Sequence, residues 1–252
     1  MQYKCEKVLL DYSDLASGRV FYSFPGYPAF PVRLASEIFQ RCIASRETIY
    51  KNATPCTLYD PCCSAAYHLS VLGYLHGQHI REIIGSDIDE KAVALAKRNL
   101  GLLRVEGLEK HIVEIRKTLE QYKKDSHKEA LASAHILKNK IAASAWEQPL
   151  ATRVFQASAM DSKTILNNIK AKSVDLVFTD VPYGQHSQWH DSGPDEFLNP
   201  LWSILNALIN ILSPSSIVSI VCDRQQKVAH KSYQSVEHFQ IGKRRVVILK
   251  PI

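Results

Sequence analysis

The stretch "LYDPCCSAAY", residues 58–67, decides the fold. Asp60 ends a short apolar run, a proline and two cysteines follow, and three small residues then lead into a helical pattern. A strand, a tight small-residue loop and a helix are how many α/β proteins bring their backbone close to a ligand. Glycine usually occupies such loops because it accepts left-handed backbone angles at little cost, whereas this loop has Ser64, Ala65 and Ala66. The position predicts a ligand-binding loop, and the composition predicts a weakened one.

Outside this stretch, short apolar runs alternate with amphipathic ones, which is the order expected of a parallel sheet wrapped by helices. We expect parallel strands over residues 57–60, 82–87, 152–157, 174–179 and 216–222. We expect helices over residues 32–45, 67–76, 91–103, 162–170 and 196–212. The last two apolar runs, 236–241 and 245–250, are separated only by "GKR". That spacing predicts a hairpin and therefore two antiparallel strands.

Residues 106–146 interrupt this rhythm, because they lack proline, have one glycine and are rich in Ala, Leu, Lys and Glu. Their helical spacing of apolar residues predicts one or two long helices inserted before the third strand. We therefore expect one domain over 1–252, with an N-terminal strap and helix at 19–46 and an insertion at about 106–147. Five parallel strands closed by an antiparallel hairpin resemble the Rossmann-like α/β fold of the class I S-adenosylmethionine-dependent methyltransferases.

The composition is that of a chain with one substantial core, since 46% of its 252 residues are apolar. No run of 18 apolar residues occurs, and the N-terminal stretch is too short in apolar residues for a secretory signal. Six cysteines are present without a CxxC pair. This pattern favours neither a zinc site nor a disulfide framework, so we expect no metal and a cytoplasmic protein.

The net charge of +6 is unevenly distributed. Residues 224–250 contain seven Lys or Arg and one acid, and residues 110–140 contain eight and four. Residues 173–222 contain five acids and no Lys or Arg. Basic flanks around a middle without cations suggest an anionic partner such as nucleic acid. An ordinary solvated surface is the alternative that charge alone leaves open.

Four acids fall where predicted strands end. They are Asp60, Asp87, Asp180 and Asp223. Ligands of an open parallel sheet bind outside the carboxyl ends of its strands. Each acid alone has a simpler explanation as the N-cap of the following helix, but the set of four predicts a ligand site at that edge.

The second of these acids lies in "IIGSDIDEKAVALAKRNL", residues 83–100. An acid at the end of the second strand is placed to bind ribose hydroxyls. Asp89 competes with Asp87 for this role, although it is better placed as a helix N-cap. The segment is very similar to the second motif of S-adenosylmethionine-dependent RNA methyltransferases. That resemblance implies that Asp60 receives the ammonium of the methionine tail and that Ser158 lies near the adenine, at a position where many such enzymes have an acid.

The segment "FTDVPYG", residues 178–184, resembles the Asp/Asn-Pro-Pro-Tyr motif of amino-methyltransferases, with Val181 in place of the first proline. A nitrogen nucleophile on a base needs an acceptor for its hydrogen, which Asp180 offers. It also needs an aromatic face that holds the base in line, which Tyr183 offers. The alternative is a plain turn built by Pro182 and the glycine. Trp189 and two histidines follow in the same loop.

Six motifs of this chain occur in the order and spacing of one protein family. They are "PGYPAFPVRLASEIFQR", "DPCC", "SDIDE", "TDVPYG", "DR" at 223–224 and "IGKR". The chain resembles the AviRa-type, avilamycin-resistance 23S rRNA guanine methyltransferases over roughly residues 10–250. The resemblance implies S-adenosylmethionine as methyl donor, 23S ribosomal RNA as partner, ring N1 of a guanine as acceptor and a link to rRNA processing and antibiotic resistance. On the motifs alone, the exocyclic N2 of guanine is an equal alternative. We expect a monomer that needs neither membrane nor metal.

The resemblance also implies a set of site residues. The catalytic candidates are Asp180, Pro182 and Tyr183. The cofactor-binding candidates are Asp60, Cys62, Ser64, Ala66, Asp87, Ile88, Ser158 and Asp180. The substrate-binding candidates are Tyr27, Phe30, Arg33, Trp189, Lys243 and Arg244.

The opening loop departs from the family's Asp-Pro-Cys-Cys-Gly-Ser-Gly-Tyr at Ser64, Ala65 and Ala66, and the two lost glycines are at 64 and 66. Two classes of function follow. The first is an active rRNA methyltransferase that tolerates the substitutions, and the second is a catalytically silent RNA-binding relative. The intact "TDVPYG" and "GSDID" favour the first. Methylation of DNA, protein or a small molecule is the remaining alternative.

Overall fold

The computed structural model describes residues 11–24, 28–144, 150–181 and 200–252, and its centre is a seven-stranded sheet in the order β3-β2-β1-β4-β5-β7-β6. The strands are β1 (Cys56–Asp60), β2 (Ile80–Asp87), β3 (Ala151–Gln156), β4 (Val174–Asp180), β5 (Leu212–Asp223), β6 (Tyr233–Ile241) and β7 (Arg244–Pro251). Strands β1 to β5 pair in parallel, whereas β7 is antiparallel to both β5 and β6. The predicted parallel sheet and its closing antiparallel hairpin are therefore confirmed.

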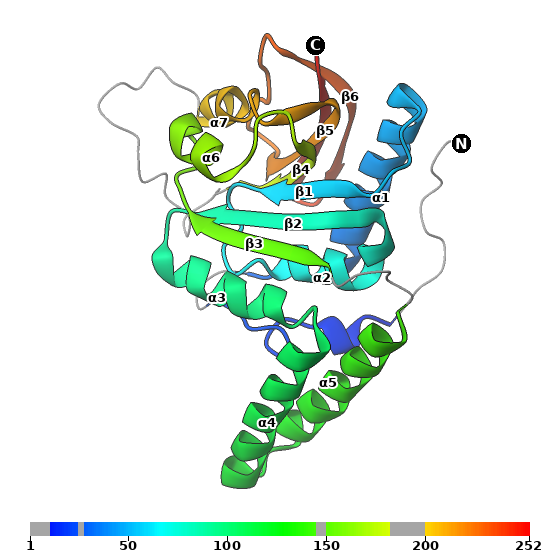
Figure 1. Ribbon diagram of the computed structural model, residues 1–252, viewed down its shortest axis with the longest axis vertical. Helices are drawn as coiled ribbons and strands as arrows, with labels where there is room; N and C mark the ends of the chain where they lie inside the picture. Colours follow the sequence, from blue (N-terminus) through cyan, green and yellow to red (C-terminus); the bar gives the residue numbers. More distant parts are fainter. Residues whose placement is uncertain (1–10, 25–27, 145–149, 182–199) are drawn as a thin grey trace.

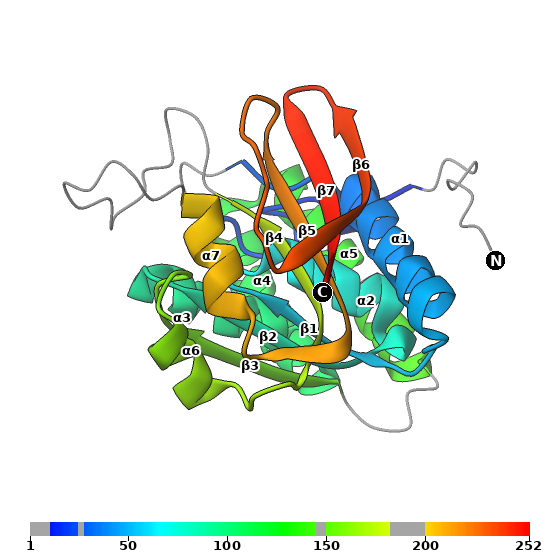
Figure 2. The same ribbon diagram turned by 90° about the horizontal axis from the view of Figure 1, so that it is seen from above.

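Helices cover both faces of the sheet (Figures 1 and 2). They are α1 (Val32–Tyr50), α2 (Tyr67–His76), α3 (Glu90–Gly101), α4 (Val105–Tyr122), α5 (Asp125–Ala143), α6 (Ser162–Asn168) and α7 (Pro200–Leu208), with two short 3-10 helices, η1 (Ser13–Leu15) and η2 (Gly77–His79). Helices α1, α2 and α3 pack on one face, and α6 and α7 pack together on the other. In the described part of the chain, no helix is long and apolar enough to cross a membrane.

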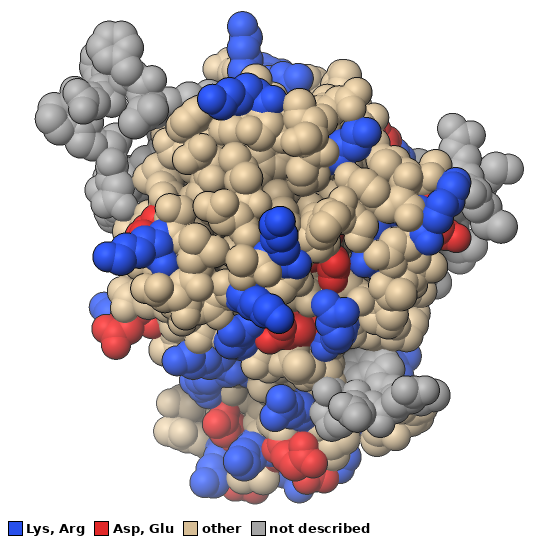
Figure 3. Space-filling view, turned by 45° about the horizontal axis from the view of Figure 1, so that its top comes forward, with Lys and Arg blue, Asp and Glu red and all other residues tan. Residues whose placement is uncertain are grey.

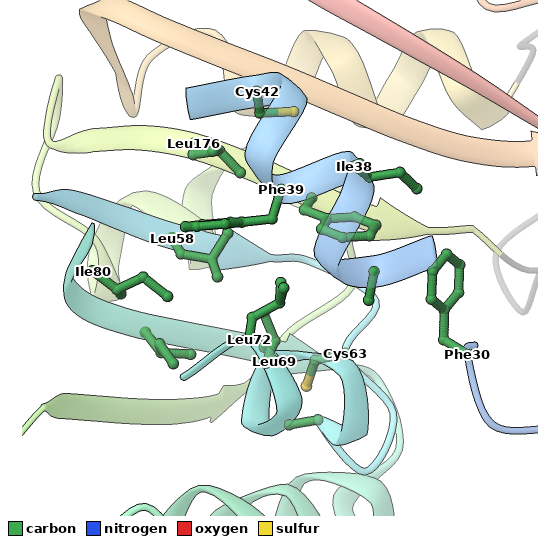
Figure 4. Close-up of a cluster of buried hydrophobic side chains, with 14 of the residues drawn as sticks. Phe30, Ile38, Phe39, Cys42, Leu58, Cys63, Leu69, Leu72, Ile80 and Leu176 are labelled. Carbon is green, nitrogen blue, oxygen red and sulfur yellow. The ribbon is translucent and has the colours of Figure 1, made fainter. Parts of the chain in front are cut away.

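The two faces follow from the alternation of side chains along each strand. On β1, Leu58 belongs to the apolar cluster under α1 and α2, whereas its neighbour Tyr59 belongs to the cluster under α6 and α7. Figure 4 shows how Phe39 of α1 and Leu72 of α2 converge on Leu58 from the helical layer. The sheet is apolar on both faces, which suits a parallel sheet covered by helices on both sides.

The predicted insertion forms two helices, α4 and α5, which extend away from the sheet beyond α3 (Figure 1). Their buried side chains form a third apolar cluster with η1, the segment around Phe21, and Tyr67 and Val71 of α2. Asn99 fastens this segment to the central body, because its Nδ2 donates to the carbonyls of Tyr22 (2.9 Å) and Ala65 (2.8 Å). The insertion is thus connected through the N-terminal strap to the loop at residues 61–66.

An ion network fixes the sheet at the opposite end from the predicted site. The buried Asp175 of β4 pairs with the buried Arg46 of α1 at 3.3 Å and with the exposed Arg81 at 3.2 Å. The same carboxylate accepts hydrogen bonds from Thr57 N (2.9 Å) and Ser213 Oγ (2.9 Å). The Asp175 carboxylate therefore compensates the buried charge of Arg46, and both of its oxygens have hydrogen-bond partners.

Several helix boundaries differ from the predictions, and the largest differences among the described residues are at the ends of α1 and α7. The helix expected over 32–45 continues to Tyr50, and the one expected over 196–212 ends at Leu208 because Leu212 already begins β5. The register between β4 and β5 shifts between Leu212 and Ile217. Pro214 lies within this shift, where a residue without an N–H does not interrupt the regular pairing. The proline that favours a break therefore lies inside a strand.

Candidate functional site

The carboxyl edge of the parallel strands collects the acids that the sequence singled out. The strands β1, β2, β4 and β5 end at Asp60, Asp87, Asp180 and Asp223, so all four predicted positions are confirmed. The chain leaves β1 toward β2 and β3 on one side, and it returns to β4 and β5 on the other. The edge between β1 and β4 is thus the topological switch point, where open parallel sheets bind their ligands.

The loop between β1 and α2 is held to this edge by backbone N–H groups. Cys62 N donates to Asp60 Oδ1 at 2.9 Å, Cys63 N to the Ser86 carbonyl at 2.9 Å, and Ser64 N to Asp87 Oδ2 at 2.8 Å. Three successive amides therefore bind the ends of β1 and β2. The loop conformation is set by the two strand ends, including the carboxylates of both acids.

The two positions where the family has glycine adopt left-handed backbone angles. Ser64 has φ +47° and Ala66 has φ +53°. This conformation is the one that glycine accepts without a steric cost, so the strain expected from the composition is present. Ala66 is fully buried in the apolar cluster under α1 and α2. Its methyl group therefore faces the protein core, and only the half-buried Ser64 has a partly accessible side chain.

Gly85 of β2 shows how closely the loop packs on the sheet. A Cβ at this position would lie 2.9 Å from Cys63 Sγ, which is too close for any side chain. Burial, followed by the charges of Asp60 and Asp87, raises the pKa of the Cys63 thiol well above its usual value. Cys63 is therefore a neutral packing residue and not a nucleophile.

The end of β2 separates the roles of the two neighbouring acids. Asp89 caps α3, because its Oδ1 accepts from Lys91 N at 2.8 Å. Asp87 faces the loop instead and also accepts from Asp89 N at 3.0 Å through its Oδ1. Burial raises the pKa of Asp87, while the N–H groups of Asp89 and Ser64 act in the opposite direction. Between the two acids, Ile88 has 40% of its surface exposed.

The segment after β3 lies beside this strand end. Ala157 N donates to the Asp87 carbonyl at 3.0 Å, and Gln156 Nε2 donates to the Ile88 carbonyl at 2.9 Å. Ser158 follows directly and is half-buried. The structure thus brings together Asp87, Ile88 and Ser158, three of the residues predicted to bind the cofactor.

On the other side of the switch point, Asp180 ends β4 and is half-buried. Val181, which replaces the first proline of the motif, is buried and donates its N–H to the Val221 carbonyl at 3.0 Å. A proline could not make this bond. The remaining motif residues Pro182 and Tyr183 lie outside the described residues, as do Tyr27 and Trp189.

Comparisons with known proteins agree with this geometry. A model of the rRNA methyltransferase AviRa family matches residues 1–244. The chain belongs to the AviRa family. It is 38% identical over 241 residues to the 23S rRNA (guanine(2535)-N(1))-methyltransferase of Streptomyces viridochromogenes, covering 96% of this chain and 92% of that protein.

Solved structures give the same result. Two structures of the rRNA methyltransferase AviRa from Streptomyces viridochromogenes, at 2.4 Å and 1.5 Å, superimpose with TM-scores of 0.81 and 0.82. They are 36% and 35% identical, and cover 96% and 95% of this chain and 93% and 92% of their own chains. The class I methyltransferase fold and the family predicted from the sequence are both confirmed.

Within this AviRa fold, the substrate candidates differ in exposure. Arg33 and Lys243 are exposed, and Arg244 is half-buried. Phe30 is only 5% exposed, lies edge-on to Phe178 (5.6 Å between ring centroids) and has the Arg244 guanidinium 5.4 Å from its ring centre. Little of the Phe30 ring is left for stacking on a base, so this contact is not supported.

Basic residues of two turns meet beside Asp223. Arg224 N donates to the Lys243 carbonyl at 3.0 Å, which joins the turn after β5 to the hairpin turn between β6 and β7. In the view of Figure 3, Lys and Arg are spread across the face, and Asp and Glu gather most toward the lower end, where α4 and α5 lie. On the face seen in Figure 3, the positive charge is dispersed and does not form one continuous patch.

One residue of the site was missed by the sequence predictions. His68, the second residue of α2, is buried, and its Nε2 lies 3.1 Å from Asp60 Oδ2. The approach has the distance of an ion pair without the alignment of a hydrogen bond. The position of His68 in the sequence could have predicted this contact, because the first side chains of a helix that follows a short loop lie near the end of the preceding strand.

Proposed function

We propose that this chain transfers the methyl group of S-adenosylmethionine to N1 of a guanine in 23S ribosomal RNA. The observation that carries the proposal is the loop at 61–66, whose amides bind Asp60 and Asp87 at the switch point of an AviRa-family fold. The named activity of the Streptomyces viridochromogenes relative supports 23S rRNA as substrate and N1 as the acceptor atom.

The residues around β2 fit the proposed cofactor. We assign Asp87 to the ribose hydroxyls, since it is the carboxylate at the end of β2 and its partners are the N–H groups of Ser64 in the loop and of Asp89. The exposed side chain of Ile88 offers an apolar surface to the adenine, with Ser158 beside it. When bound, S-adenosylmethionine supplies a methyl group on a sulfonium centre, ready for attack by a nitrogen.

The surroundings of Asp60 favour a role different from the one that the resemblance implied. It is 0% exposed, accepts from Cys62 N and faces His68. A direct contact with the ammonium of the methionine tail would require this enclosure to open. We therefore propose that Asp60 shapes the loop, whose backbone surrounds the methionine tail.

We assign the acceptor chemistry to Asp180. N1 of guanine carries a hydrogen that must leave when the methyl group arrives, and a carboxylate within hydrogen-bond distance can hold or accept it. Asp180 ends β4, the strand next to β1, so the acceptor side adjoins the cofactor loop. A guanine that is paired or stacked must first leave its stack to reach such an edge. Tyr183 follows in the same motif as the proposed stacking face.

The ribosomal RNA itself would be held by cations near this edge. Arg33 is the second residue of α1, Lys243 lies in the turn between β6 and β7, and Arg244 begins β7; we assign all three to RNA phosphates. A catalytically silent relative is less well supported by the structure than by the loop composition alone. The Ala66 methyl group faces the core, and the loop keeps the backbone angles that glycine would adopt.

Transfer of tritiated methyl groups to 23S rRNA, with the product identified by mass spectrometry, tests this function. Asp180→Ala should nearly abolish transfer, because a positioned proton acceptor contributes about 10²–10⁴-fold, while cofactor binding persists. Asp223→Asn is the matched control, since Asp223 also ends a strand but accepts from Gln225 N in a local turn at 2.9 Å.

Tyr183→Phe should retain most of the activity and Tyr183→Ala should lose it, because a face and not a hydroxyl is needed. Full transfer by Asp180→Ala would exclude the assigned role of Asp180. A wild-type protein that methylates neither naked rRNA nor unmethylated ribosomal particles would identify a silent relative, and a product methylated at N2 would correct the acceptor atom.

A further inference from the structure

His68 occupies a central place that the proposed chemistry does not use. It lies between the carboxyl ends of β1 and β4, with Asp60 Oδ2 3.1 Å from its Nε2. Its ring is 5.1 Å from that of Phe178 and 5.8 Å from that of Phe30. A histidine that is buried among aromatic rings and faces a fully buried carboxylate is held there by the fold.

The surroundings of His68 decide its charge. The charged and titratable groups on the elements packed around it are Asp60 of β1, the thiols Cys62 and Cys63 of the loop, Asp180 of β4 and, beyond the Phe30 ring, Arg244 of β7. Burial alone lowers the pKa of His68. The contact and charge of Asp60, the charge of Asp180 and the Phe178 carbonyl outweigh it, so that the pKa is raised overall.

We propose that His68 acts as a positioning residue for methyl transfer, an imidazolium that holds Asp60 in place and joins the cofactor loop to the Asp180 end of the site. This inference rests on the proposed function. Asp60 Oδ1 binds Cys62 N, so the orientation of the carboxylate fixes the first residues of the loop. The opposite oxygen is the one that faces His68. Loss of the cation would leave a buried carboxylate uncompensated and release the loop.

The direction of the pH effect follows from the raised pKa. Below the ordinary value of 6.5 the imidazolium is present in both the folded and the unfolded chain, and the pair contributes fully. As the pH rises through the higher folded pKa, the proton leaves and the contribution is lost. Cofactor affinity should therefore fall on the alkaline side, with a midpoint above 6.5.

The same helix supplies a matched control. His76 is the last residue of α2, stacks on Phe39 at 5.1 Å and has its Nε2 2.9 Å from Ser36 Oγ. Burial lowers its pKa to about 4, so it is neutral at physiological pH. His76→Asn removes a packed imidazole of α2 without removing a charge near the site.

The first experiment is an NMR titration of the histidine side chains in the wild-type protein and in Asp60→Asn. It needs neither cofactor nor turnover, so it is independent of the proposed function. The midpoint of the His68 ring should lie above the ordinary value of 6.5 in the wild type and should fall in Asp60→Asn. A wild-type midpoint at or below 6.5, or one that stays the same in Asp60→Asn, would overturn the inference.

The second experiment measures the binding of S-adenosylmethionine by calorimetry between pH 6 and pH 9. Removing one partner of a buried ion pair leaves the other uncompensated, so His68→Asn should weaken binding about tenfold or more at pH 6 and remove the alkaline decline. His76→Asn should keep the wild-type profile even where its stability falls. Equal losses in both variants, or an unchanged profile in His68→Asn, would show a merely structural histidine. If His68→Asn does not fold, the NMR titration decides alone.

Discussion

Replacing Ser64 and Ala66 by glycine shows whether backbone strain in this loop lowers the stability of the fold or the affinity for the cofactor. Ser64 and Ala66 both have left-handed angles, which cost a residue with a Cβ about 1–2 kcal/mol. Glycine removes that cost but gains about 0.4–1 kcal/mol of disorder in the unfolded chain. For Ser64→Gly the two effects leave a net stabilisation of about 0.5–1 kcal/mol.

Ala66→Gly should behave differently, although the backbone angle is the same. The Ala66 methyl group is fully buried in the core, and removing a buried methyl-sized group costs about 0.8 kcal/mol. This loss cancels the remaining gain, so the stability of Ala66→Gly should stay near that of the wild type. The double variant should therefore match Ser64→Gly and not exceed it.

The loop angles are fixed by hydrogen bonds to Asp60, Ser86 and Asp87 within the fold. The strain is consequently borne by folding, and cofactor affinity should change by less than about threefold, well under the 1.4 kcal/mol that a tenfold change represents. Urea unfolding and calorimetry with S-adenosylmethionine measure the two quantities on the same samples.

Lys172→Gly is the matched control, because Lys172 is exposed, has φ +55° and lies before β4, at the opposite end of that strand from Asp180. It should gain stability as Ser64→Gly does, without any effect on the cofactor. A destabilised Ser64→Gly would contradict the strain argument. A tenfold gain in the cofactor affinity of Ser64→Gly would show that the serine at position 64 impairs cofactor binding and not folding.

Three further outcomes are expected. Asp87→Ala should weaken S-adenosylmethionine binding about tenfold or more in calorimetry, because a charged acceptor is lost, and an unchanged affinity would reject the ribose assignment. Charge reversal of Lys243 and Arg244 should lower RNA affinity and reduce the salt slope by up to about 0.9 for each lost phosphate contact; filter binding that ignores salt would exclude an electrostatic contact. Asp175→Ala should destabilise the protein by about 3–5 kcal/mol in urea unfolding, since the buried Arg46 loses its partner, and a change below 1 kcal/mol would contradict this.

The sequence predicted the sheet well because its signals are local. Each parallel strand is a short apolar run, and four of them end in an acid, so strand ends such as Asp60 and Asp87 were found to the residue. Helix α2 has the predicted bounds because a small-residue loop precedes it and its apolar residues follow at once. The start of β5 was predicted less well, because the strand expected from residue 216 begins at Leu212 and accommodates Pro214 at a register shift.

The site was predicted less completely because part of it depends on contacts between distant segments. Motif positions identified Asp87 and Asp180, but the enclosure of Asp60 by His68 depends on the direction in which α2 leaves the loop. The burial of Phe30 depends on Phe178 and Arg244, which are far away in the chain. No local sequence pattern distinguishes an aromatic ring that packs on a strand end from one that is exposed and can stack on a nucleobase.

In the substituted loop, the fold requires left-handed backbone angles, which glycine adopts most easily, and does not require glycine itself. The family's glycines permit left-handed angles, and here Ser64 and Ala66 adopt those angles without being glycine. Tertiary hydrogen bonds make this possible, since each is worth about 1 kcal/mol and those to carboxylates more, which is comparable with the strain at each residue. The Ala66 N–H is itself bonded to the Cys63 carbonyl at 2.7 Å. A loop tied at its strand ends can lose its glycines and keep its shape, so the change in composition shifts stability before it shifts function.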